Sequence, residues 1–231
     1  LGDSIRSSRP IADEIFTSRF WITLELAVYS TILAVFLGIL AGIISAVKKS
    51  SPADIGVMFI ALFGLSMPNF WLGLMLIQYF AVDLGWFRPS GWGTWSQTVL
   101  PVITLGTGGA AIIARMTRSS MLEVISQDYI RTARAKGVRE RVIIYRHALK
   151  NAMIPVITVI GLEFGGLLGG AVLTESVFAV NGMGRYVVDS IRGRDFPVVQ
   201  ATVLVLSVMF VLVNLLVDIS YRYFNKRIDF D

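Results

Sequence analysis

Long stretches without a charged side chain constrain this chain more than any other feature of its sequence. Five of them stand out, the last interrupted only by Glu163: residues 26–47, 55–82, 89–114, 196–217 and 151–174. A helix crosses about 30 Å of hydrocarbon with about 20 mainly apolar residues, so each stretch is long enough for one crossing. The chain is 55% hydrophobic and only 16% charged, well below the charged fraction of about a quarter in soluble domains. The sequence therefore predicts an all-α integral membrane protein.

Five transmembrane helices account for these stretches, and we place them near residues 21–47, 56–80, 98–118, 152–177 and 198–221. Residues 21–231 then form one transmembrane domain, which residues 1–20 precede as a polar segment. The loop from Asp83 to Gln97 holds three Trp among Gly and Pro, which is typical of an aromatic belt that anchors a fold at the membrane surface. Because the chain has no cysteine and a single histidine, we expect neither disulfides nor a metal centre.

Basic residues indicate which side of the membrane each loop faces. The segments 48–54, 115–151 and 222–231 hold fourteen of the 21 Lys and Arg, and the opposite loops hold the remaining seven. By the positive-inside rule the first group is cytoplasmic. Residues 1–20 are therefore expected to be extracytoplasmic, and the carboxyl terminus cytoplasmic. An outside start without a signal peptide predicts a further helix upstream, which makes six in the full-length protein.

The loop after the third predicted helix, residues 119–151, is the longest cytoplasmic loop, and we call it the basic loop. Seven Lys or Arg lie between Asp128 and Pro155. Asp128 is an acceptable helix N-cap, and Gly137 stands where a left-handed residue would end that helix. A second helix is predicted from Val138, because four residues share one helical face: Val138, Val142, Tyr145 and Leu149. The basic loop is thus expected to be a helix, a glycine turn and a second helix.

Three kinds of partner would explain the charge of the basic loop. Nucleic-acid binding would use the charge, but neither a DNA-binding framework nor interleaved aromatic residues accompany it. Anionic lipid heads would attract a basic segment beside the membrane without any further partner. A cytoplasmic protein docked on the loop would also explain the small residues Ala133, Ala135 and Gly137, which permit close approach of another backbone. The residues alone leave lipid contact and protein docking open.

The basic loop resembles the EAA motif in the membrane subunits of bacterial binding-protein-dependent ABC importers. The general pattern, a Glu-Ala-Ala, a Gly and a later Ile-x-Leu-Pro, matches here only at Ala133, Gly137 and Leu149. RTARAKG followed by HALKNAMIP, however, is similar to the form of the dipeptide, oligopeptide and nickel permease branch. The resemblance covers essentially the whole chain, through LGDSIRSSRPIADEI, SMPNFWLG, LPVITLG and ESVFAVNGMGRYVVDSIRGRDFPVVQA. Asn181 stands where that branch usually has Pro.

The resemblance implies a type I ABC importer fold in the bacterial cytoplasmic (inner) membrane. The permease subunit would pair with a second homologous permease, bind two cytoplasmic ATPases that hold ATP and Mg, and receive substrate from an extracytoplasmic binding protein. It would bind no cofactor itself, contact membrane lipid and no nucleic acid, and it is not an enzyme, since no G-x-x-x-x-G-K-[ST] motif is present. The EAA loop would be the coupling helix, with nine contact residues: Asp128, Tyr129, Arg131, Thr132, Ala133, Arg134, Ala135, Lys136 and Gly137.

Di- or oligopeptides are the expected substrates, because peptide permeases dominate this branch. Nickel or metal chelates, glutathione and opines are the alternatives within the family. The rival function is a self-contained channel or ion-driven transporter, for which the basic loop would be only a charged connection. Inverted repeats or several charges inside the spans would favour that rival, whereas here only Glu163 lies within a predicted span.

Four residues within the spans are candidates for the translocation pathway. Glu163 is ionisable, and a charged group inside the membrane marks a functional site by default. It would contact a peptide's amino terminus or a cationic substrate, or pair with an Arg of the basic loop or of the partner subunit. Ser66, Pro68 and Asn69 lie in the second span, where proline frees a backbone carbonyl. Their alternative role is a kink that neighbouring helices satisfy.

Glycines four residues apart predict close packing between helices. Gly38 and Gly42 form one such pair, and the segment GLEFGGLLGG, residues 161–170, contains three more. Small residues at this spacing permit close backbone approach in membrane bundles. Smooth glycine faces would also let helices slide during alternating access, and the two roles are compatible.

Overall fold

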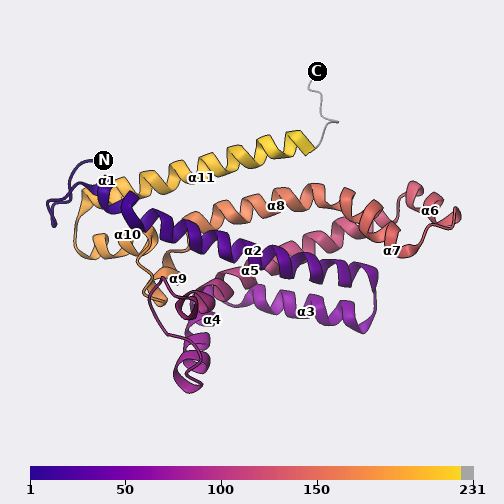
Figure 1. Ribbon diagram of the computed structural model, residues 1–231, viewed down its shortest axis with the longest axis horizontal. Helices are drawn as coiled ribbons and strands as arrows, with labels where there is room; N and C mark the ends of the chain where they lie inside the picture. The colour runs from indigo at the N-terminus through magenta and orange to yellow at the C-terminus, as the bar shows by residue number, and fades with distance from the viewer. Residues whose placement is uncertain (225–231) are drawn as a thin grey trace. The chain divides into compact units, whose positions relative to one another are not determined.

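The computed structural model describes residues 1–224, and within them the chain is helical and forms no β-strand. Residues 225–231, which include most of the predicted basic tail and the carboxyl terminus, lie outside the described residues. In chain order, with η for π-helical turns, the elements are α1 (Ile11–Glu14), η1 (Ile15–Arg19), α2 (Phe20–Val47), α3 (Pro52–Ser66), α4 (Asn69–Leu76), η2 (Ile77–Asp83), α5 (Trp95–Ile125), α6 (Asp128–Ala135), α7 (Glu140–Val142), η3 (Ile143–Ala148), α8 (Leu149–Gly170), α9 (Val172–Val177), α10 (Met183–Arg192) and α11 (Phe196–Phe224) (Figure 1).

Within residues 1–224, four helical stretches are long and apolar enough to cross a membrane. They are Ile11–Val47, Trp95–Ile125, Glu140–Gly169 and Phe196–Ile219. A fifth crossing is present by length and composition when α3 is counted together with α4 and η2. The predicted all-α membrane architecture is confirmed.

The second predicted span is not one helix, as its range 56–80 implied. The chain bends by 100° between α3 and α4, at Met67 and Pro68. Pro68 has no N–H for the helix ladder, and its ring disfavours the helical conformation of Met67. Pro68 instead caps the start of α4, with an extended ψ of 132°. The predicted kink is therefore a complete break between two helices.

The fourth predicted span, 152–177, is interrupted as well. Helix α8 ends at Gly170, and Ala171 caps the short helix α9. Gly169 and Gly170 precede the interruption, and glycine has a low helix propensity because it loses much backbone freedom in a helix. The helix break after α8 therefore begins where the glycine-rich segment ends.

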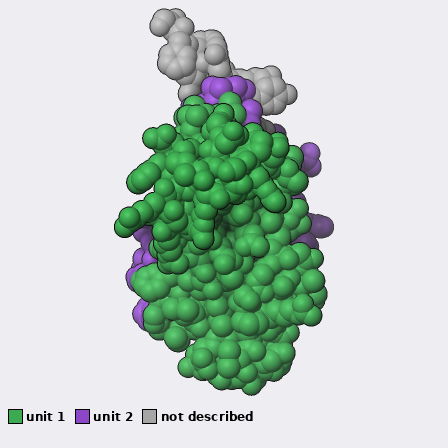
Figure 2. All heavy atoms as spheres, turned by 90° about the vertical axis from the view of Figure 1, so that its left-hand side faces the viewer, with its two compact units in different colours: residues 1–33, 67–106, 163–214 green, residues 34–66, 107–162, 215–231 purple. Residues whose placement is uncertain are grey.

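The described chain divides into two compact units, which Figure 2 distinguishes by colour. Unit 1 contains residues 1–33, 67–106 and 163–214, and unit 2 contains residues 34–66, 107–162 and the described residues from 215 to 224. The boundaries fall inside the continuous helices α2, α5, α8 and α11, and at the break between α3 and α4. Each unit thus takes one part of the same membrane-crossing helices.

Each unit has apolar clusters of its own. In unit 1, Phe178 and Val180 after α9 pack with Leu100 of α5, and Ile11 and Ile15 pack with Met183 of α10. These side chains are fully or almost fully buried. The turn segments around α9 and α10 are therefore packed parts of unit 1.

The glycine pair of α2 packs in unit 2 as its spacing predicts. A Cβ on Gly38 would lie 2.7 Å from Ile113 Cβ, and one on Gly42 would lie 2.5 Å from Thr117 Cβ. Helices α2 and α5 therefore touch along their backbones. In the later segment the prediction holds for Gly161, which meets Val217 in the same unit.

Candidate functional site

The first helix of the basic loop, α6, ends as the sequence predicts. Gly137 has a φ of +75°, a left-handed conformation that side chains other than glycine rarely adopt. The N–H of Val138 donates to the carbonyl of Ala133 at 3.2 Å, and the N–H of Gly137 donates to that of Arg134 at 2.9 Å. These two bonds form a complete Schellman motif. The start of the helix differs, because Gln127 is its N-cap and Asp128 is its first helical residue.

The second helix of the basic loop begins at Glu140 rather than at Val138, and it continues as the π-helical turn η3 into α8. Its predicted apolar face is only half correct, because Val138 and Leu149 pack against the buried cluster of unit 2 while the other two residues do not. Val142 and Tyr145 are exposed, whereas the buried side chains are Ile143, Ile144 and Ala148. The hydrogen bonds of a π-turn run from residue i to i+5, so its side chains fall out of the helical register that the prediction assumed.

Ile130 is the one fully buried apolar side chain of α6 that anchors it to the rest of unit 2, and the half-buried Ala133 packs against the same cluster. Ile130 is fully buried and packs in one cluster with Ile43 of α2, Met121 of α5 and Ile143 of η3. Burial of a side chain of this size stabilises by roughly 1.5–3 kcal/mol. The helix is thus fixed on one face while its other faces remain exposed.

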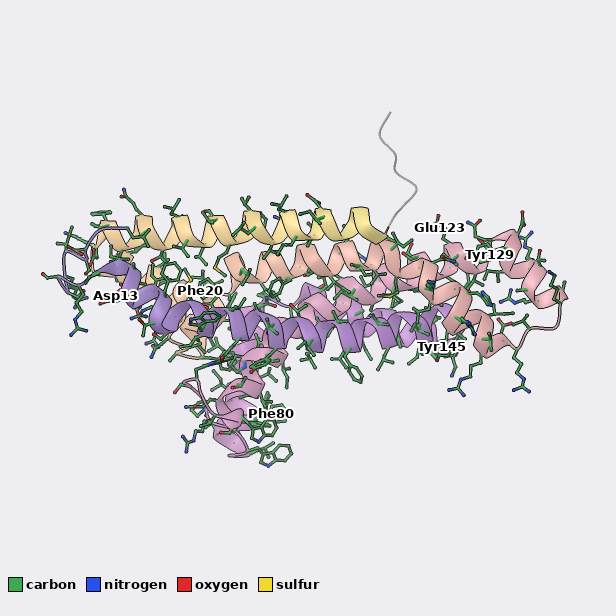
Figure 3. All side chains as sticks on the ribbon, turned by 45° about the horizontal axis from the view of Figure 1, so that its top comes forward. Asp13, Phe20, Phe80, Glu123, Tyr129 and Tyr145 are labelled. Carbon is green, nitrogen blue, oxygen red and sulfur yellow. The ribbon has the colours of Figure 1, made fainter. Side chains whose placement is uncertain are left out.

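The nine predicted contact residues lie on this exposed surface, except that Ala133 is half-buried. Figure 3 shows Tyr129 and Tyr145 on the two helices of the basic loop. Asn151 Nδ2 donates to the hydroxyl of Tyr129 at 2.8 Å, which ties α6 to the start of α8. Arg134 binds Glu140 through two hydrogen bonds of 2.6 and 3.1 Å, across the turn at Gly137. The structure therefore presents α6 as a short, braced helix with a polar outer surface.

A buried ion pair fixes the end of α2 and the start of α3 to α5, and the sequence did not reveal it. Arg118 Nε and Nη2 each lie 2.8 Å from an oxygen of Asp54, whose residue is only 3% exposed. The hydroxyl of Ser45 and the N–H of Ser50 also donate to this carboxylate. Asp54 and Arg118 are 64 positions apart, so no local pattern connects them. Arg118 lies on the same helix that leads into the basic loop.

The structure places the pathway candidates without joining them. The hydroxyl of Ser66 donates to the carbonyl of Leu62 at 2.9 Å within α3, and the exposed Asn69 begins α4. Glu163 is half-buried in α8. Among the described residues, Glu163 forms no ion pair and no hydrogen bond with Pro68 or Asn69. The expected pairing of Glu163 with an Arg of the basic loop is therefore not found within the described chain.

A second buried carboxylate lies in unit 1, at the start of the segment 175–201. Glu175 is fully buried and accepts hydrogen bonds from the hydroxyl of Thr23 at 2.7 Å and from the N–H of Arg185 at 2.9 Å. The same hydroxyl accepts the N–H of Met183 at 2.9 Å. Burial raises the pKa of Glu175, and these donors oppose that effect.

The sequence Gly-Met-Gly gives this carboxylate its place at the start of α10. A Cβ on Gly182 would lie 2.5 Å from the carboxyl group of Glu175. One on Gly184 would lie 2.7 Å from the Cα of Val172. Both glycines are therefore required by close approach, which explains why two small residues flank Met183.

Similarity to known proteins shows the family to which this chain belongs. Residues 38–230 match the family of binding-protein-dependent transport system inner membrane components. The chain belongs to this family. The match begins within α2 and includes the whole basic loop and the Glu175 turn. The recognition of the permease from its EAA-like loop is confirmed.

Two curated relatives are similar to this permease over nearly its whole length. The glutathione transport system permease protein GsiC of Escherichia coli K12 is 50% identical over 228 residues, covering 99% of this chain and 74% of the relative. The dipeptide transport system permease protein DppB of Alkalihalophilus pseudofirmus is 46% identical over 258 residues, covering 100% of this chain and 77% of the relative. Both relatives are permease proteins, so this chain is a membrane permease subunit.

A solved structure agrees with the fold of the permease. The MetNI methionine ABC transporter, in an inward-facing conformation, superposes with a TM-score of 0.77 at 20% identity and covers 91% of this chain and 96% of that chain. An amino acid ABC transporter gives a TM-score of 0.69 at 17% identity. The predicted type I importer fold is thereby confirmed.

Proposed function

We propose that this permease subunit forms part of an ATP-driven importer that takes up di- or oligopeptides by alternating access. The relative named as a dipeptide transport system permease supports this substrate class, since it is 46% identical over the whole chain. That whole-length identity is the observation that carries the proposal. A second permease and an extracytoplasmic binding protein complete the translocation pathway, and two partner ATPases hold ATP and Mg.

Glutathione is the second candidate substrate. The relative named as a glutathione transport system permease is 50% identical over 228 residues, slightly more than the dipeptide relative. Glutathione is itself a small peptide with a free amino group. A pathway that admits short peptides therefore has suitable dimensions and polarity for both substrates.

The basic loop is the proposed docking surface for the ATPases. Its helix α6 is anchored by Ile130, braced by the pair Arg134–Glu140 and terminated by the left-handed Gly137. Such a helix can pass a movement of the ATPases to the membrane helices without bending, because its ends are fixed by packing and by hydrogen bonds. Asp128, Arg131 and Lys136 supply exposed charge for polar contacts.

The orientation of the chain follows from this role. The basic loop lies in the cytoplasm, and residues 1–20 lie outside it, as the distribution of basic residues favours. Residues 1–231 contain no cysteine, so single cysteines introduced at Ser7 and Lys136 test the orientation of this part of the permease. In intact cells, an impermeant thiol reagent should label the variant Ser7→Cys and should reach Lys136→Cys only after permeabilisation. The reverse result would invert the proposed topology.

Transport assays test the substrate. The full-length permease, expressed with its partner subunits and reconstituted in proteoliposomes, should take up labelled dialanine only with ATP at the ATPases and binding protein on the other side. Reduced glutathione should compete with dialanine if both use this pathway. ATP-independent uptake of dialanine would instead support a self-contained transporter.

A glycine substitution tests the coupling role of the turn. Gly137→Val should lower dialanine uptake about tenfold and weaken recovery of the ATPases with the permease, because a positive φ costs an ordinary residue about 1–2 kcal/mol. Gly85→Val is the matched control, since Gly85 also has a positive φ, of +64°, and open space around its Cβ position. Equal transport by the two variants would contradict the coupling role.

A further inference from the structure

Glu25 is an exposed carboxylate on α2, a helix that crosses the membrane. It has no Lys or Arg within ion-pair distance in the described part of the chain. From Glu25 to Val47 the helix is about 33 Å long at about 1.5 Å per residue, which is close to the thickness of about 30 Å of the hydrocarbon core. With Val47 on the cytoplasmic side, Glu25 lies at the extracytoplasmic border. A charge without a partner at that depth requires a polar neighbour or a cation.

A pocket of about 420 Å³ opens beside this carboxylate in unit 1. Aromatic side chains from the loop and from α2 line it, namely Tyr29, Trp92 and Trp95. Trp92 Nε1 donates to Glu25 Oε2 at 3.0 Å, while Glu25 Oε1 has no hydrogen-bond partner among the described residues. One oxygen is thus used to hold the side chain, and the other is available to a ligand.

Two of the three aromatic rings of this pocket contact apolar side chains outside it. Trp92 packs against the buried Leu26 and Leu100. Trp95 meets the ring of Phe87 edge-on, with 5.8 Å between the centroids. Its own side chain is 74% exposed and borders the pocket. The tryptophan side of the pocket is therefore supported by packing.

Carboxylate and aromatic rings together select a cation. A protonated amine gains an ion pair with the carboxylate and cation–π attraction from ring faces, of which Trp gives the strongest. An anion would meet only the negative charge of Glu25 and the negative faces of the rings. The pocket therefore suits a cationic group, such as an ammonium, that arrives from the extracytoplasmic side.

We propose that the pocket formed by Glu25, Tyr29, Trp92 and Trp95 binds the α-ammonium group of the incoming peptide at the outer entrance of the permease. This inference rests on the proposed peptide function, and it adds a site to it. It also gives Trp92 and Trp95 of the loop 83–97 a role beyond anchoring at the membrane surface. The ammonium head of an amino phospholipid has the same chemistry, so the test separates the two sources.

Equilibrium binding of labelled dialanine tests the site on the assembled complex, without ATP and without binding protein. The complex is placed in nanodiscs of phosphatidylglycerol, which carries no amine. Wild type should bind dialanine saturably, and N-acetyl-dialanine should fail to displace it. Glu25→Gln keeps an acceptor for Trp92 but removes the charge, and it should weaken binding about tenfold. Trp95→Leu should weaken it about threefold.

Asp83→Asn is the matched control for loss of one negative charge on the same side. Asp83 is exposed and accepts a hydrogen bond from Gln78 at 2.9 Å, outside the pocket. The affinity of the Asp83→Asn variant for dialanine should equal that of wild type. The inference is overturned by equal losses in Asp83→Asn and Glu25→Gln, by displacement with N-acetyl-dialanine, or by no saturable binding up to millimolar dialanine. It is also overturned if nanodiscs with phosphatidylethanolamine abolish binding, because the lipid head then fills the pocket.

The proposed function fails separately from this site. ATP-dependent uptake of dialanine is measured in parallel on the same wild-type preparation. Uptake without Glu25-dependent binding overturns the ammonium site and leaves the importer intact. Absence of ATP-dependent uptake overturns the importer itself.

Discussion

Both units of the permease contain buried carboxylates, and Asp54 and Glu175 show two different ways of stabilising them. Asp54 in unit 2 is met by the guanidinium of Arg118. Glu175 in unit 1 is met by the hydroxyl of Thr23 and by backbone N–H groups at the start of α10. The Asp54 site depends on the charge of its partner. The Glu175 site depends on the space around the carboxylate, because neutral donors must come very close to it. Loss of a charge should therefore damage unit 2 most, and added volume should damage unit 1 most.

The largest effect is expected from Arg118→Leu. It leaves the buried Asp54 carboxylate without its counter-ion, and it should lower the melting temperature of the purified permease complex by roughly 5 °C or more. The double variant Asp54→Leu with Arg118→Leu removes both charges and should melt higher than the single variant. Arg115→Leu is the control, because Arg115 is exposed and has no ion pair in the described chain. A double variant no better than the single one would contradict the role of charge.

Next in size is Gly184→Ala. Its new methyl group would lie 2.7 Å from a backbone atom, the Cα of Val172, and it should destabilise the permease by about 1–3 kcal/mol. Gly166→Ala is the matched control, since nothing lies within 4 Å of a Cβ there. Thermal unfolding of both variants measures the difference. If they melted at the same temperature, the importance of space in unit 1 would be refuted.

A pH effect should follow from Asp195, which is also in unit 1. The hydrogen bond from the hydroxyl of Ser4, with further help from the N–H groups of Arg6 and Ile5, holds the pKa of Asp195 below its usual value. A lowered folded-state pKa stabilises the protein above about pH 4, and this contribution is lost as the pH falls through the folded pKa. Asp195→Asn should remove that part of the acid sensitivity. Melting curves recorded at falling pH measure it, and an unchanged acid slope would be evidence against it.

The smallest effect is expected from Arg134→Ala. The pair with Glu140 is exposed, with 42% and 54% of the two side chains accessible, so its loss should change stability by less than about 1 kcal/mol. Transport should fall further than stability if the pair braces the coupling helix. The ratio of dialanine uptake to intact complex measures the two effects together. A loss of stability as large as that of Arg118→Leu would remove the contrast between buried and exposed pairs.

Local patterns predicted the membrane-crossing stretches, the first helix of the basic loop and the turn at Gly137. Hydropathy and glycine conformation act over a few residues, so they are visible in one sequence. The register of the second loop helix was missed because a π-turn leaves no clear hydropathy signal. The pairs Asp54–Arg118 and Thr23–Glu175 join residues 64 and 152 positions apart, so only the folded chain brings them together.

The break at Pro68 also limits what can surround the permease in the membrane. Pro68 has no N–H to offer the carbonyl of Gly64, four residues earlier, so that oxygen loses its usual helical donor. In hydrocarbon, an unsatisfied backbone group costs several kcal/mol, and irregular backbone persists there only against protein or water. Lipid tails are therefore excluded as the neighbour of this bend. Whatever adjoins the bend in the assembled transporter, protein or water, must offer a hydrogen-bond donor to the carbonyl of Gly64.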